Sequence, residues 1–166
     1  MSFTIATFWT NALYRRCAEK LMESCADLPF VGRPMDHCLS ANEIMRHKAE
    51  LVLDLLQGGD FDGVLFLDAD ALVSKPDDVR RMCEALVARR VDAAWHWFEH
   101  FNDDVARRMY RGMTHWPGGG TLWFGNTVEA KRLLLHWMAE WSRPGQERWN
   151  DQVKLYDAYL RTPGVT

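Results

Sequence analysis

Two aspartates one residue apart, Asp68 and Asp70, are the side chains whose types and spacing best suit chemistry in this sequence. They directly follow residues 64–67, four large apolar residues that fit a strand buried on both faces. Because an unpaired buried charge is costly, packing alone does not favour an acid pair at the end of such a strand. Open α/β sheets bind ligands at the carboxyl ends of their strands, where paired carboxylates suit Mg²⁺ or Mn²⁺ with a phosphate-bearing substrate. The simpler alternative is that both aspartates only cap the next turn.

Lys48 is the second candidate, because it interrupts the apolar stripe of a predicted helix over residues 41–57. Ile44, Lys48, Leu51 and Leu55 follow the spacing of one helical face. A lysine in that place either extends along its stem into solvent or directs its ammonium at a diphosphate. The sequence leaves both interpretations open.

Three consecutive glycines, residues 118–120, precede a predicted strand over residues 121–124. Glycines let a backbone approach a ligand closely or adopt a positive φ. The alternative is an ordinary Pro-Gly turn that leads into the strand.

Asn150, Asp151 and Gln152 begin the last predicted helix. Asn and Asp are common N-cap residues, so helix capping is the simplest role for this group. A carboxylate at a helix N-terminus also suits contact with a sugar hydroxyl or with a metal, and the two roles remain alternatives.

His96 and two tryptophans complete the candidates. His96 lies on a predicted strand and should face away from Trp95 and Trp97; packing is the simpler role, and metal binding the alternative. Trp116 and Trp149, in or beside predicted loops, are candidates for stacking on a ligand.

The elements that must position these residues alternate between strand and helix along the chain. This alternation predicts an α/β fold with a largely parallel sheet covered by helices on both faces. Helix starts are predicted by two capping-box patterns, Ser40 with Glu43 and Asn126 with Glu129. The predicted strands span residues 3–9, 64–67, 91–98 and 121–124, and the predicted helices span residues 12–26, 41–57, 76 onward, 102–111, 126–141 and 150–160.

Length and composition narrow the classes of function. The 166 residues predict one domain, and the net charge of −3 offers no general attraction for nucleic acid. The four cysteines lack the C-x-x-C spacing of a zinc site or redox pair. We find neither a signal-peptide pattern nor a run of about 18 apolar residues, and therefore expect a cytoplasmic protein without a transmembrane segment.

The order of these features over residues 3–160 resembles the GT-A-fold glycosyltransferases, the nucleotide-diphospho-sugar transferases. The Asp-Ala-Asp strand end is the most specific part of the resemblance, and the Gly-rich stretch and the Asp-Gln pair add weight by their order. The resemblance implies a GT-A-like, Rossmann-like three-layer domain over residues 1–166 with a mainly parallel central sheet. It also implies a metal-dependent transfer of a sugar from a nucleotide-diphospho-sugar donor to an acceptor.

The resemblance implies roles for five residues of the amino-terminal half. Asp68 and Asp70 match the Asp-x-Asp motif that holds Mn²⁺ or Mg²⁺ on the donor diphosphate, with Asp68 also close to the donor ribose or sugar. Thr7 and Phe8 match the region that contacts the nucleotide base. Lys48 matches a basic position that faces donor phosphate or sugar.

Four later residues also match the family. Gly119 and Gly120 match the turn beneath the donor sugar. Asp151 and Gln152 match the catalytic Asp-Gln pair, which contacts sugar hydroxyls near the anomeric carbon, and Asp151 is the candidate base. The chain lacks the later His-containing segment that supplies a third metal ligand in many members. The acceptor stays open among a glycan, a protein, a small molecule and a modified DNA base.

Two rival functions fit parts of the pattern. One is a non-catalytic nucleotide- or sugar-binding module of the same fold, which the short carboxyl-terminal region favours. The other is a haloacid-dehalogenase-type phosphatase, which also places Asp-x-Asp after an apolar strand. That family has Thr or Val where this sequence has Leu72, and its motif usually lies near the N-terminus.

Overall fold

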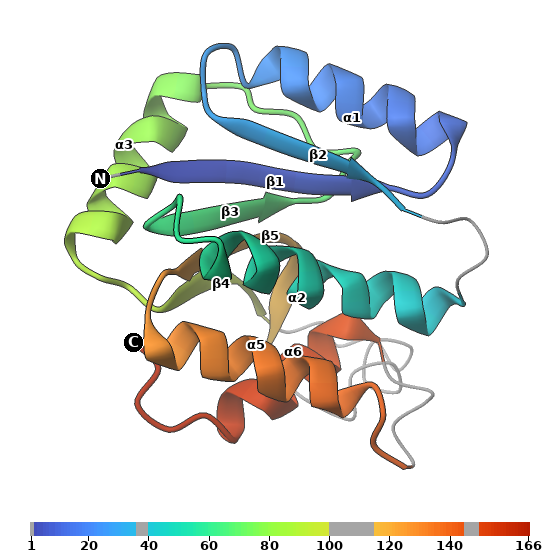
Figure 1. The fold of residues 1–166 in the computed structure, drawn as a ribbon, viewed down its shortest axis with the longest axis vertical. Coiled ribbons are helices and arrows are strands. Elements are labelled where there is room, and N and C mark those ends of the chain that lie inside the picture. Colours follow the sequence, from blue (N-terminus) through green and yellow to red (C-terminus); the bar gives the residue numbers. More distant parts are fainter. Residues whose placement is uncertain (1, 36–39, 100–114, 145–149) are drawn as a thin grey trace.

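A computed structural model describes residues 2–35, 40–99, 115–144 and 150–166. The predicted helix over residues 102–111 lies outside these ranges. Figure 1 shows a twisted central sheet between two layers of helices, which confirms the predicted α/β class.

The sheet has five strands in the order β2-β1-β3-β5-β4. β1 pairs in parallel with β2 and β3, whereas β5 pairs antiparallel with both β3 and β4. Four strands therefore run in one direction and β5 runs against them, and β3 is interior, as its apolar sequence predicted. The strands are β1 (Phe3–Trp9), β2 (Phe30–Pro34), β3 (Gly63–Leu67), β4 (Ala93–Glu99) and β5 (His115–Gly125).

The helices form one layer on each face of the sheet (Figure 1). One face carries α1 (Ala12–Ser24) and α3 (Pro76–Ala88), and the other carries α2 (Ala41–Gln57), α5 (Val128–Glu140) and α6 (Asp151–Leu160). No helix in the described ranges has both the length and the apolar character needed to cross a membrane.

β3 explains why the run before Asp68 is uniformly apolar. Val64 and Phe66 pack into the core beneath α2 and α5, whereas Leu65 and Leu67 pack into the core on the α1 and α3 side. All four side chains are at most 6% exposed. Alternate residues of a strand point to opposite faces, so a strand covered on both faces requires apolar residues at every position.

The two predicted capping boxes had different outcomes. Ser40 and Glu43 form the predicted reciprocal pair at the start of α2. The prediction that Asn126 caps α5 is wrong, because Thr127 is the N-cap and accepts a hydrogen bond from the Ala130 amide at 3.1 Å. The Asn126 side chain instead donates to a backbone oxygen just before β3, a long-range partner that a local pattern does not reveal.

The glycine-rich stretch is part of β5 rather than a loop before it. Trp95 of β4 pairs with Leu122, and Trp97 pairs with Pro117, so the single residue between the tryptophans faces the four residues 118–121. The extra residues form a bulge in β5. Such a bulge suits glycines, because they tolerate the backbone bend and carry no side chain that would block a close approach.

We predict that Gly63→Ala destabilises the fold by about 1–3 kcal/mol, because a Cβ at this position would overlap the buried indole ring of Trp123. Urea unfolding measures the change. Gly58→Ala is the matched control, since its Cβ would meet no heavy atom closer than 3.6 Å and its φ of −60° suits alanine. Equal unfolding midpoints for both variants would contradict the tight Gly63–Trp123 packing.

Candidate functional site

The Lys48 ammonium joins three separate elements at the carboxyl edge of the sheet. Its Nζ lies 2.9 Å from Asp68 Oδ1, just after β3, and 2.9 Å from Asp151 Oδ2 at the start of α6. It also donates a hydrogen bond to the Gly119 carbonyl oxygen of β5 at 3.2 Å. The structure thus brings together four of the residues that the sequence singled out.

Burial excludes one of the two roles considered for Lys48, extension of its side chain into solvent. The residue is 5% exposed, and its Nζ lies 5.5 Å from the centre of the Phe66 ring, so the ammonium does not extend into solvent. Desolvation lowers the pKa of Lys48, but the charges of Asp151 and Asp68 outweigh it and hold that pKa above its ordinary value of 10.5. Lys48 is therefore a charged group fixed among protein atoms.

Asp68 is more exposed than Lys48: 41% of its side-chain surface is open to solvent, against 6% for the lysine. Desolvation by the surrounding protein raises the pKa of Asp68, Lys48 opposes this rise, and the charges of Asp151 and Asp70 add to it. The net pKa lies above the ordinary value of 3.8. Burial is the largest cause of this rise, and the nearby Asp151 and Asp70 carboxylates contribute less.

Asp151 is not needed as the cap of α6, because Asn150 is the N-cap and accepts from the Val153 amide at 3.0 Å. One Asp151 oxygen accepts from the Gln152 amide at 3.0 Å, and the other contacts Lys48. Trp137 donates its indole N–H to the Asp151 carbonyl oxygen at 3.2 Å, which ties the start of α6 to α5. The Asp151 carboxylate is therefore fixed in orientation, with 13% of its side-chain surface exposed.

The β5 glycines make room for these carboxylates. A Cβ added to Gly119 would lie 2.8 Å from Asp151 Oδ2, and one added to Gly120 would lie 2.9 Å from Asp68 Oδ2. Both separations are too short for a carbon–oxygen contact, so any side chain there would displace an acid. The Asp68 amide also donates to the Gly120 carbonyl oxygen at 2.9 Å, which places Asp68 directly beside β5.

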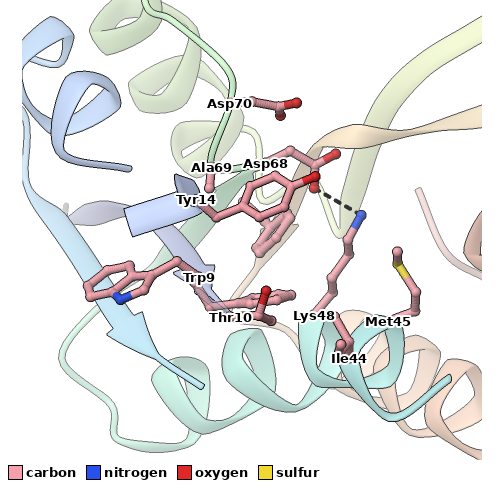
Figure 2. A pocket seen from close by; sticks show the side chains of 11 residues that line it. Trp9, Thr10, Tyr14, Ile44, Met45, Lys48, Asp68, Ala69 and Asp70 are labelled. Atoms are coloured by element: carbon pink, nitrogen blue, oxygen red, sulfur yellow. Dashed lines mark ion pairs between the residues drawn. The ribbon is translucent and has the colours of Figure 1, made fainter. Parts of the chain in front are cut away.

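A cavity of about 280 Å³ opens at the same edge and runs from aromatic residues to the acids. Figure 2 shows Lys48 and Asp68 facing each other across an ion pair, with Trp9 at the opposite end and with Tyr14 and Thr10 between. Its lining consists of Phe8, Trp9, Thr10, Tyr14, Ile44, Met45, Lys48, Phe66, Asp68, Ala69 and Asp70. The cavity therefore combines an aromatic end with an acidic end.

The two base-contact candidates of β1 have different places. Phe8 lines the cavity, and its ring meets His47 at 5.3 Å between centroids. Thr7 is fully buried in the sheet and does not line the cavity; its hydroxyl finds no hydrogen-bond partner in the described part of the chain. The alternation of a strand explains the difference, because neighbouring side chains point to opposite faces.

Sequence reasoning missed several lining residues. Trp9 and Thr10 follow Phe8 at the end of β1, where the position alone could have indicated them. The sequence marks Ile44 only as part of the apolar stripe that contains Lys48. Tyr14 and Met45 gave no local signal, because each lines the cavity only through the way its helix packs on the sheet.

Asp68 and Asp70 carry the carboxylate oxygens that could hold Mg²⁺ or Mn²⁺. Both line the cavity, and Asp70 is exposed, which matches ions that bind one or two carboxylates and take their remaining ligands from water and phosphate. Among the described residues, no three His, Cys, Asp or Glu side chains cluster as a metal site, so no third protein ligand is assigned.

The remaining aromatic candidates are placed only in part. His96 meets Phe98 edge-on at 4.9 Å between ring centroids, whereas Trp95 and Trp97 contact each other, so the predicted alternation along β4 is present. Trp149 lies outside the described residues, and so does the side chain of Trp116.

The fold is shared with a known structure. One solved structure, described as "crystal structure of a glycosyltransferase involved in the glycosylation of the major capsid of PBCV-1", matches 99% of this chain and 80% of its own length. The TM-score is 0.67 and the sequence identity is 12%, so the likeness concerns the fold. No protein-family model and no curated protein matches the sequence.

We predict that Lys48→Met destabilises the protein by about 2–4 kcal/mol at neutral pH, because it leaves the mostly buried Asp151 carboxylate without its cation. Adding Asp151→Asn should recover part of the loss by removing that charge, and a double-mutant cycle from urea unfolding measures the coupling. Arg46→Met on the same helix is the control, since its pair with Glu50 is partly open to solvent and should be worth about 1 kcal/mol or less. No coupling between Lys48 and Asp151 would rule out the buried ion pair.

Proposed function

We propose that this protein is a GT-A-type glycosyltransferase that moves a sugar from a nucleoside-diphosphate donor to an acceptor with Mn²⁺ or Mg²⁺. One observation carries the proposal: a buried ammonium holds Asp68 and Asp151 together at the acidic end of an aromatic-lined cavity. A fold shared with a glycosyltransferase supports the same class.

The aromatic end of the cavity suits the nucleoside. Phe8, Trp9 and Tyr14 offer ring surfaces, and stacking of a base on an aromatic side chain is worth about 1–3 kcal/mol. The cavity also contains Asp68 and Asp70, so a diphosphate attached to a nucleoside on these rings would lie beside the acids. The reverse orientation, with the base beside Lys48, would instead leave the diphosphate among the aromatic rings, away from the ammonium and from Asp68 and Asp70.

Asp68 and Asp70 would hold the divalent ion, which when bound neutralises the charge that grows on the diphosphate as the glycosidic bond breaks. Lys48 fixes Asp68 on one side through Oδ1. This fixed geometry means that little reorganisation of Asp68 is needed when the donor binds, and preorganised charges of this kind stabilise a transition state most effectively.

The donor sugar would lie against Gly119, Gly120 and the Asp151–Gln152 pair. The glycines leave space over the acids, and the fixed Asp151 carboxylate can accept a hydrogen bond from a sugar hydroxyl. In the transfer, an acceptor hydroxyl oxygen bonds to the anomeric carbon while the bond to the phosphate oxygen breaks. The electron pair leaves with the nucleoside diphosphate, and the acceptor proton passes to a base, for which Asp151 is the candidate, or to the leaving phosphate.

The deciding experiment incubates the pure protein with UDP-glucose, UDP-galactose, UDP-N-acetylglucosamine and GDP-mannose in the presence of Mn²⁺ and measures released nucleoside diphosphate. Release above the rate without protein supports a transferase. Metal-dependent nucleotide binding with no release from any donor would favour the non-catalytic binding module. Release of phosphate from simple phosphate esters would favour the phosphatase.

We predict that Asp70→Ala weakens binding of UDP in the presence of Mn²⁺ by at least about tenfold, which is about 1.4 kcal/mol. Isothermal titration with Mn²⁺ and with EDTA measures the metal-dependent part. Asp60→Ala is the control, because it removes an exposed carboxylate that precedes β3, at the other end of that strand. Equal UDP affinity in wild type and Asp70→Ala, with and without metal, would show that Asp70 only closes the turn.

We also predict that Asp151→Asn lowers turnover by at least about tenfold, roughly 1.4 kcal/mol of barrier, because the substitution keeps the shape and removes the charge. Asn150→Ala provides the contrast, since losing the N-cap should cost about 1 kcal/mol of stability. Released nucleoside diphosphate and thermal melting are measured for both variants. An Asp151→Asn protein that melts several degrees lower yet turns over normally would assign Asp151 a structural role alone.

A further inference from the structure

An aromatic group lies between β4 and α6, away from the nucleotide cavity. Trp97 meets Tyr156 at 6.1 Å and Tyr159 at 6.5 Å between ring centroids, and Trp95 meets Tyr159 at 5.5 Å. These contacts are edge-on, with interplanar angles of 71–88°. Trp97 is nevertheless 38% exposed and Tyr156 is half-buried, so the outer side of the group is open to solvent.

This aromatic group borders the residues assigned to the donor sugar. Tyr156 follows Gln152 by four residues on α6, so the two side chains lie one helical turn apart on the same face. Trp97 pairs with Pro117, two residues before Gly119, which itself lies against Asp151. Tyr156 therefore lies one helical turn from Gln152, and the strand partner of Trp97 lies two residues from Gly119.

The sheet order separates the aromatic group from the nucleotide cavity. The cavity is lined by β1, α1, α2 and the end of β3, whereas Trp97 belongs to β4 at the other edge of the sheet (Figure 1). The Lys48 cluster lies between them, at the end of β3 and beside Gly119 of β5. A molecule that rests on Trp97 and Tyr156 would thus approach the donor sugar from the side opposite the nucleoside.

We propose that Trp97 and Tyr156 form the acceptor subsite and that the acceptor is a carbohydrate, a proposal that rests on the proposed transferase function. A sugar ring presents a face of C–H groups that packs on an aromatic ring, while its hydroxyls remain available for hydrogen bonds. The exposed aromatic surface is only two rings long and borders the polar side chain of Gln152. Those dimensions suit one amphipathic sugar ring better than an acyl chain or an extended apolar peptide.

The test uses saturation-transfer NMR with methyl glycosides of glucose, galactose, mannose and N-acetylglucosamine, recorded with UDP and Mn²⁺ present. We expect saturation of the ring protons of at least one glycoside, and at least about tenfold weaker binding of it to Trp97→Leu. Phe98→Leu is the matched control, because Phe98 is 39% exposed, adjacent in sequence and on the opposite face of β4. Trp97→Phe keeps a ring at the site and should retain part of the binding.

UDP affinity, measured on the same samples, separates failure of the acceptor subsite from failure of the transferase proposal. UDP binding that is equal in wild type and Trp97→Leu, with glycoside binding lost only in the latter, supports the acceptor subsite. If UDP binds but no glycoside does, or if Trp97→Leu and Phe98→Leu behave alike, the carbohydrate subsite is wrong and the transferase proposal stands. If neither UDP nor GDP binds wild type, the transferase proposal itself fails.

Discussion

A buried ammonium needs anionic partners, and this need governs the carboxyl edge of the sheet. Lys48 lies in a helix face that is otherwise apolar, where an isolated charge would be strongly unfavourable. Asp68 and Asp151 meet that need from two other elements. α2, the end of β3 and the start of α6 are therefore held in register by one nitrogen atom.

The same constraint explains features that look unrelated in the sequence. Two carboxylates around one lysine need space, and the bulge at Gly119 and Gly120 provides it where any side chain would collide. Asn150 caps α6 and so leaves the Asp151 carboxylate available for the ion pair. A glycine pair, an N-cap and an ion pair are each common in proteins. Here all three lie around the Lys48 ammonium, and together they position the carboxylates at this edge of the sheet.

The sequence predicted what depends on local or periodic patterns. The β3 run and the Ser40 capping box follow from strand and helix physics, and both are present. The place of Lys48 in an apolar stripe correctly marked it as unusual. The pattern could not show whether its ammonium reaches solvent or pairs with carboxylates from other elements. Features set by distant partners were missed, such as the choice of Thr127 over Asn126 as N-cap. The bulge in β5 and the contribution of Tyr14 to the cavity also depend on packing between elements far apart in the chain.

The large sequence separation within the Lys48 cluster has a consequence for how the protein folds. Lys48 and Asp151 are 103 residues apart, and Lys48 and Gly119 are 71 apart. Closing such long loops carries an entropic cost that local helices and neighbouring strands avoid, so we expect these contacts to form late in folding. During synthesis, the amino-terminal half can pair β1, β2 and β3 before α6 exists, and the lysine then lacks one of its two anions. The site is thus completed only when the last helix docks, which couples the appearance of its chemistry to completion of the fold.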